Sequence, residues 1–167
     1  MVIRDSSYPR LPSMYWGERI YATPGCGKTY VANKYRDVVD GDDLIVRAIS
    51  TVSPEFDHGS YDDPRKVIFR YFRYINFNSR KKWQVYNVAL DLMQEACDCD
   101  DVVLFGTMDL IDNADRIFLE KDTYIVRNGF EDKQDREEEL AEEAQAPVHY
   151  IYEYLDNSLQ KTCRNSY

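Results

Sequence analysis

Eight residues, ATPGCGKT from Ala22 to Thr29, have the composition of a phosphate-binding loop. Gly25 and Gly27 permit backbone angles and close ligand approach, so successive N–H groups can point inward at the start of a helix and cradle an anion. The Lys28 ammonium would contact the β- and γ-phosphates of a nucleoside triphosphate, and the Thr29 hydroxyl would coordinate Mg²⁺. We therefore predict nucleotide binding by the following residues: Thr23, Pro24, Gly25, Cys26, Gly27, Lys28, Thr29 and Tyr30.

The segments that flank this loop have the order that phosphate binding requires. An extended run, Glu18–Ala22, precedes the loop, and the spacing of Val31, Ala32 and Tyr35 predicts a helix from Lys28. The usual pattern opens with Gly, and Ala22 is the smallest replacement for it. A glycine-rich turn that contains GKT by chance would not need a strand before it and a helix after it, so the context favours phosphate binding.

A cluster of acids follows one helix later. Val38 and Val39 predict a short buried strand that runs into Asp40, Asp42 and Asp43. Acids at a strand end often only solvate a loop. Here, however, the carboxyl ends of neighbouring parallel strands would border one crevice, so we expect the acids to face the phosphate loop.

A basic and aromatic segment stands out in a chain of net charge −9. Helical spacing is predicted over 64–78 and again from about 80 to 96, and no acid occurs between Arg65 and Lys82. One interpretation is a solvated amphipathic helix whose aromatics lie in the core. The other is an acceptor-binding surface, in which Arg65, Arg70 and Arg73 bind an anion and aromatic rings stack on a base.

Composition predicts one domain over residues 1–167, with 44% hydrophobic residues to form its core. We expect an extended lead-in over 1–17, an acceptor-binding helical region over 50–96 that opens with a turn-rich stretch, and a lid over 122–146. The acidic balance argues against general nucleic-acid affinity, so any nucleic-acid contact would be confined to 65–82.

Nothing in the sequence indicates a membrane or an oxidising compartment. No apolar run has membrane-spanning length, and the first residues lack a signal-peptide core. The four cysteines lack zinc-site spacing, so we expect reduced thiols, a cytoplasmic protein and no membrane partner. Oligomeric state is not predicted.

Alternation of strands and helices predicts an α/β fold with a central parallel sheet of about five strands and helices on both faces. The predicted strands are 18–22, 38–39, 101–107, 116–120 and 148–152. Within the strand over 101–107, Val102 to Phe105 form a continuous apolar run, as expected of a central parallel strand. In many proteins with a phosphate-binding loop, the corresponding strand ends in an acid that lies near Mg²⁺. This strand ends in Gly106 and Thr107 instead, and Asp109 follows two residues later.

The phosphate loop followed by DGDD resembles the P-loop small-molecule kinases, such as shikimate, gluconate and adenylylsulfate kinases. The 5′-polynucleotide kinases carry a related acidic pair. The resemblance covers Glu18 to Leu44, and beyond that it is only architectural. It implies a P-loop NTPase fold, ATP or GTP and Mg²⁺ as cofactors, and phosphoryl transfer as the reaction.

The resemblance also implies roles for individual residues. Asp42 would accept the proton of the acceptor hydroxyl, with Asp43 as the alternative, and Asp40 would contact the metal together with Thr29. A lid supplies arginines over the phosphates in such kinases, and Arg127 and Arg136 lie in the corresponding interval. Alternatively, these two arginines pair with neighbouring acids at the surface.

Three hypotheses follow. The first is an ATP- and Mg²⁺-dependent kinase that acts on a small anionic acceptor, for which a nucleotide or nucleoside is the expected class and a nucleic-acid 5′ end the alternative. The second is an NTPase that couples hydrolysis to a partner or nucleic acid. The third is a phosphate-loop fold used only for binding.

Overall fold

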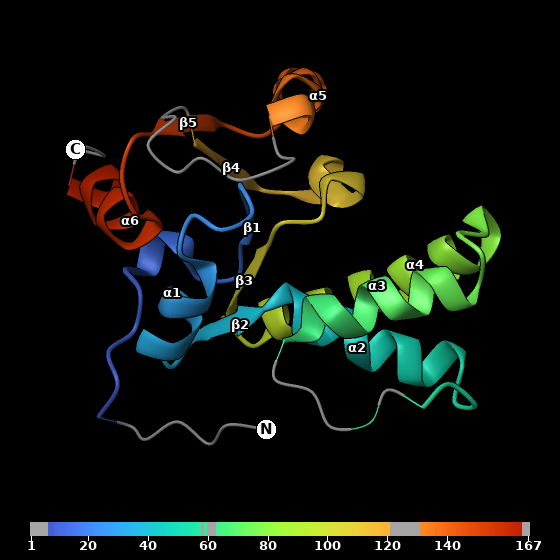
Figure 1. The fold of residues 1–167 in the computed structure, drawn as a ribbon. Coiled ribbons are helices and arrows are strands. Elements are labelled where there is room, and N and C mark those ends of the chain that lie inside the picture. Colours follow the sequence, from blue (N-terminus) through green and yellow to red (C-terminus); the bar gives the residue numbers. More distant parts are fainter. Residues whose placement is uncertain (1–6, 58, 60–62, 121–130, 165–167) are drawn as a thin grey trace.

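The computed structural model describes residues 7–57, 59, 63–120 and 131–164. The fold is α/β, as predicted: one five-stranded sheet has all its strands parallel, in the order β2-β3-β1-β4-β5 (Figure 1). The strands are β1 (Arg19–Ala22), β2 (Val38–Asp40), β3 (Val102–Phe105), β4 (Arg116–Glu120) and β5 (Val148–Ile151). The helices are α1 (Lys28–Lys34), α2 (Gly41–Val52), α3 (Pro64–Tyr74), α4 (Ser79–Asp98), α5 (Glu131–Glu143) and α6 (Leu155–Arg164), with 3₁₀ helices η1 (Ser13–Tyr15) and η2 (Met108–Asn113).

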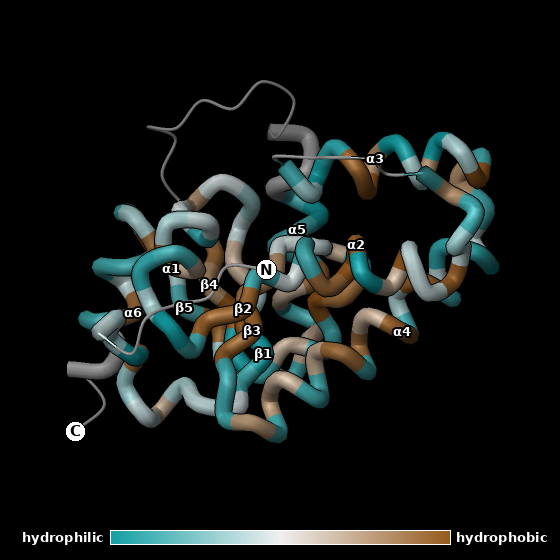
Figure 2. Tube along the Cα trace, turned by 90° about the horizontal axis from the view of Figure 1, so that it is seen from below, coloured by the Kyte–Doolittle hydropathy of each residue, from teal (hydrophilic) through white to brown (hydrophobic). Residues whose placement is uncertain are grey.

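Helices cover both faces of the sheet, which makes β3 buried along its whole length. Val102 and Leu104 belong to the core under α1 and α6, whereas Val103 and Phe105 belong to the core under α2 and α4. Figure 2 shows α1 and α6 on one side of the sheet and α2 and α4 on the other, with hydrophobic residues in the strands between them. A continuous apolar run is the pattern expected of a strand buried on both faces.

The described part of the lead-in, residues 7–17, packs on the core under α1 and α6. Leu11 and Tyr15 are buried there, and the Tyr15 hydroxyl donates a hydrogen bond to the carbonyl of Leu159 in α6. A side chain of the lead-in thereby ties the start of the described chain to the closing helix.

Helix α2 was not predicted, because its first turn consists of the acids that also mark the end of β2. The Asp40 side chain accepts a hydrogen bond from the backbone N–H of Asp42 and caps the helix. Leu44, Ala48 and Ile49 are then buried. The helix continues to Val52, so the turn-rich stretch expected from residue 50 begins three residues later. Helix α4 is likewise capped by a side chain, that of Asn78, which accepts a hydrogen bond from the Lys81 N–H.

Helices α2, α3 and α4 extend past the edge of the sheet (Figure 1). The inner surface of this group is aromatic: Phe72 packs edge-to-face on Tyr86, and Phe56 packs on Tyr71. The region 50–96 is thus largely helical, and residues of α3 and α4 line a cavity together with the loop between β1 and α1. Within the described ranges, no helix is long and apolar enough to cross a membrane.

Candidate functional site

The loop between β1 and α1 has the backbone conformation that its glycines allow. Gly25 and Gly27 have φ values of +81° and +106°, in the left-handed region that side chains disfavour. Lys28 opens α1, and its Nζ donates hydrogen bonds to the carbonyls of Ala22 at 3.2 Å and Thr23 at 3.3 Å. The ammonium group therefore lies against the carboxyl end of β1, above the loop.

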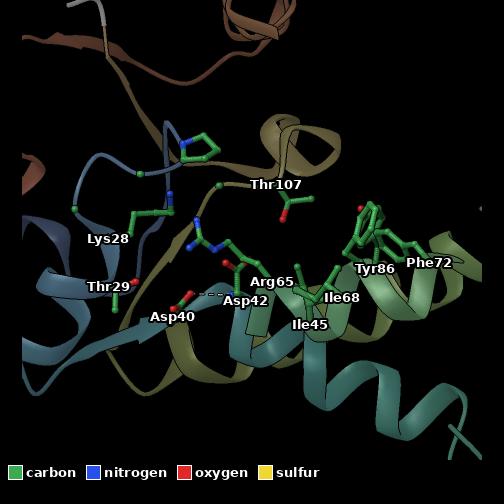
Figure 3. A pocket seen from close by; sticks show the side chains of 15 residues that line it. Lys28, Thr29, Asp40, Asp42, Ile45, Arg65, Ile68, Phe72, Tyr86 and Thr107 are labelled. Carbon is green, nitrogen blue, oxygen red and sulfur yellow. Dashed lines mark hydrogen bonds between the residues drawn. The ribbon is translucent and has the colours of Figure 1, made fainter. Parts of the chain in front are cut away.

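A cavity of about 470 Å³ opens where the carboxyl ends of β1, β2 and β3 meet (Figure 3). The loop between β1 and α1 forms one wall, and Asp40, Asp42 and Arg65 lie across from it. The full lining is Pro24, Gly25, Gly27, Lys28, Thr29, Asp40, Asp42, Ile45, Arg65, Ile68, Phe69, Phe72, Tyr86, Gly106 and Thr107. Parallel α/β sheets bind ligands at this edge.

Asp40 and Asp42 interact with each other through a hydrogen bond and through their charges. Asp40 Oδ1 accepts the Asp42 N–H at 3.0 Å. Burial, and then the charge of Asp40, raises the pKa of Asp42 to about 6, although Lys28 and Arg65 oppose the shift. Burial also raises the pKa of Asp40. A carboxylate whose pKa lies close to neutral pH is suited to accept a proton during a reaction.

Asp43 lies outside the cavity. Its side chain is exposed, whereas the Asp42 side chain lines the cavity. Successive residues of a helix point about 100° apart, so only one of the two acids can face the loop. Of the two candidates for the base, the geometry favours Asp42.

Arg65 is held at the mouth of the cavity by the cap of α3. Asp63 accepts the Arg65 backbone N–H at 3.0 Å, and its carboxylate accepts Nε at 3.2 Å and Nη2 at 3.3 Å. The same contact lowers the pKa of Asp63. In Figure 3 the guanidinium lies beside Asp42.

The other two predicted acceptor-binding arginines do not reach the cavity. Arg70 and Arg73 are exposed on α3, and the Arg73 guanidinium lies 5.9 Å from the centre of the Phe69 ring. Residues three, four and seven positions after Arg65 share its face of the helix, and those positions hold Ile68, Phe69 and Phe72. The predicted arginine cluster is therefore reduced to Arg65.

Three predicted loop residues also turn away from the cavity. Thr23 is 1% exposed, and its hydroxyl donates to Glu137 Oε1 and accepts the Glu120 N–H, each at 2.9 Å. Cys26 is buried in the core under α1 and α6, and Tyr30 is exposed on α1. Within the loop, only Pro24, Gly25, Gly27, Lys28 and Thr29 line the cavity.

Sequence analysis missed Glu137, which lies in the acid-rich helix α5. Glu137 is 1% exposed, and it accepts hydrogen bonds from the Tyr21 hydroxyl at 2.5 Å and the Thr23 hydroxyl at 2.9 Å. Burial raises its pKa, and the two hydrogen bonds oppose that shift. Its one signal in the sequence is weak: Leu140 and Ala141 follow it at helical spacing.

The predicted lid arginines do not contribute to the site as described. Arg127 lies outside the described residues. Arg136 is exposed on α5 and is not among the cavity residues. The described part of the predicted lid is mostly α5, which is attached to β1 through Glu137.

Lys28 takes the space where an acid after β3 would lie. A Cβ atom on Gly106 would lie 2.8 Å from Lys28 Nζ and 3.0 Å from its Cε. Asp109 does not line the cavity, because it accepts the Tyr86 hydroxyl at 3.2 Å and pairs with Lys82 at 3.3 Å. Asp40 and Asp42 are thus the carboxylates of the cavity.

The donor set fits Mg²⁺ bound together with a nucleotide. The Thr29 hydroxyl and the Asp40 carboxylate both line the cavity. Among the described residues, no group of three or more His, Cys, Asp or Glu side chains is placed to hold a metal ion by itself. Mg²⁺ in nucleotide sites commonly uses one or two protein oxygens and completes its shell with phosphates and water.

A scan of the chain against protein-family models finds no match, and a search of curated proteins finds no similar sequence. Functional inference therefore depends on the chemistry and geometry of this cavity.

Proposed function

We propose that this protein is a P-loop kinase, which transfers the γ-phosphoryl group of ATP or GTP to a small acceptor. The observation that carries the proposal is the place of Asp42 in the cavity that Lys28 and Thr29 also line. A phosphate loop alone is common to kinases, motors and switches. A half-buried carboxylate opposite the loop supplies what a kinase needs in addition, namely a group that receives the acceptor proton.

The reaction needs positioning and charge neutralisation more than covalent participation by the protein. The acceptor oxygen forms a bond to the γ-phosphorus, the bond from that phosphorus to the bridging oxygen breaks, and the acceptor proton passes to Asp42. Lys28 and the loop N–H groups would hold the phosphates, and Arg65 would offset charge at the mouth of the cavity. Mg²⁺, held by Thr29 and Asp40, would neutralise the phosphate oxygens.

The end of β3 favours transfer over hydrolysis. Hydrolytic P-loop enzymes use an acid there for the metal and the attacking water, whereas this chain has Gly106 and Thr107. Because a side chain at position 106 would collide with Lys28, an acid cannot take this place without displacing the ammonium group.

Product analysis tests the proposal. The full chain is incubated with γ-labelled ATP or GTP, Mg²⁺ and a panel of alcohols, nucleosides, nucleotides and 5′-hydroxyl oligonucleotides. We expect a labelled acceptor, and we expect Asp42→Asn to slow transfer about 10²- to 10⁴-fold. Asp43→Asn, a change at the adjacent exposed acid, is the matched control and should leave transfer unchanged.

Three results would contradict the proposal. Free phosphate with no labelled acceptor would indicate an NTPase. Full transfer by Asp42→Asn would show that another group receives the proton. Nucleotide affinity that is unchanged in Lys28→Ala would further show that the loop does not hold phosphate.

A further inference from the structure

The cavity continues past Asp42 into a wall that is almost entirely apolar. Ile68 and Phe72 of α3 lie beside Tyr86 of α4 in Figure 3, and Phe69 adds a ring that is 57% exposed. The rings of Phe72 and Tyr86 meet edge-to-face with their centres 5.9 Å apart. The Tyr86 hydroxyl donates to Asp109, so the residue presents mainly its ring to the cavity.

The charged groups that line the cavity balance one another. They are the cations Lys28 and Arg65 and the acids Asp40 and Asp42. Lys28 belongs to the phosphate loop, and Arg65 is bound by Asp63 and interacts with both acids. Among the described residues, the lining therefore has no cation committed to a phosphate on the acceptor itself, and such a phosphate would approach two carboxylates.

We propose that the ligand of this wall, and hence the acceptor, is an uncharged nucleoside. Its planar base would stack among Phe69, Phe72 and Tyr86, and its hydroxyl would lie at Asp42. The inference rests on the proposed kinase function and narrows the anionic acceptor expected from the sequence. In the transfer, the nucleoside oxygen gains the phosphoryl group, Asp42 gains the proton, and a nucleoside diphosphate leaves.

Stacking would supply affinity at this wall, and charge would discriminate between a nucleoside and its 5′-monophosphate. Each stacked base adds affinity to an aromatic site, and the contact depends on the ring face more than on the identity of the base. The cavity volume of about 470 Å³ lies within the usual range for small-ligand sites. A nucleoside would therefore bind by its base, whereas a 5′-phosphate would add repulsion from Asp40 and Asp42.

The experiment is calorimetric titration of the full chain, with ADP and Mg²⁺ present, against four nucleosides, their 5′-monophosphates and a 5′-hydroxyl tetranucleotide. We expect at least one of adenosine, guanosine, cytidine and thymidine to bind. Its monophosphate should bind about tenfold more weakly, which corresponds to 1.4 kcal/mol.

Phe69→Ala should weaken nucleoside binding about 10- to 100-fold. Phe77→Ala is the matched control, because Phe77 is 58% exposed, like Phe69, but does not line the cavity. Neither change removes a buried ring, so both variants should fold.

The outcomes separate the two proposals. Tighter binding of the monophosphate or of the tetranucleotide, no binding of any nucleoside, or equal effects of the two Phe variants would overturn the nucleoside site. Nucleoside binding that depends on Phe69 but leads to no phosphate transfer would support the site and overturn the kinase function.

Discussion

The backbone N–H of Asp42 donates a hydrogen bond to Asp40 Oδ1 at 3.0 Å, so the first acid of the cluster starts the helix that carries the second. Asp40→Ala should remove this cap and destabilise the protein by about 0.5–2 kcal/mol. Asp40→Asn keeps a capping oxygen but removes a charge, so its stability should stay closer to the original while the Mg²⁺ dependence of transfer weakens. Urea unfolding and Mg²⁺ titration measure the two effects. Equal losses of stability in both variants would contradict the capping role.

The rate of transfer should fall as the pH drops through about 6. The pKa of Asp42 is raised to about 6, and a protonated carboxyl group cannot accept the acceptor proton. Below that value the rate should decrease about tenfold per pH unit. A pH–rate profile at saturating nucleotide measures this. A rate that stays constant from pH 7 to pH 5 would exclude Asp42 as the base.

Asp42→Asn should stabilise the free protein at pH 8. The folded-state pKa of about 6 exceeds the ordinary value of 3.8, so the folded state binds more protons than the unfolded state between these values. Stability is therefore lost as the pH rises from about 4 to 6, and the charged carboxylate remains costly above that range. The variant should gain about 1–3 kcal/mol at pH 8 and little at pH 3.5. Urea unfolding at both pH values, with Asp43→Asn as control, measures the difference.

Gly106→Ala should weaken nucleotide binding with little change in stability. The new Cβ would lie 2.8 Å from Lys28 Nζ, and the flexible lysine can move away from it. We expect about a tenfold loss of nucleotide affinity, measured by fluorescence titration. Gly41→Ala is the contrasting variant: its Cβ would lie 2.6 Å from Phe105 Cβ and 3.0 Å from the Leu104 carbonyl, so it should destabilise the fold.

Glu137→Ala should destabilise the protein and loosen the start of the loop that follows β1. Removal of the Glu137 carboxylate leaves the buried hydroxyls of Tyr21 and Thr23 without this acceptor. The free energy of unfolding should therefore fall by about 1–3 kcal/mol. Glu139→Ala, at an exposed position of the same helix, should have little effect. Thermal unfolding of both variants measures the difference, and equal midpoints would show that the Glu137 contacts contribute nothing.

Local patterns in the sequence were sufficient for the strand, glycine-rich loop and helix around Lys28 and for the alternation of strands and helices. Gly25, Gly27 and Lys28 act through backbone conformation and immediate neighbours, which short-range spacing records. The same local information was ambiguous at Asp40, which both ends a strand and caps a helix. Helix α2 was missed for this reason.

The sequence by itself therefore determined that a glycine-rich loop with a lysine lies between a strand and a helix, with acids one helix later. The tertiary structure decided which residues face the resulting cavity: Asp42 and not Asp43, Arg65 and not Arg70 or Arg73. It also buried Glu137 within a run of exposed acids. The physical reason is that the direction of a helical side chain depends on how the whole helix packs, and packing joins residues that are far apart in the chain.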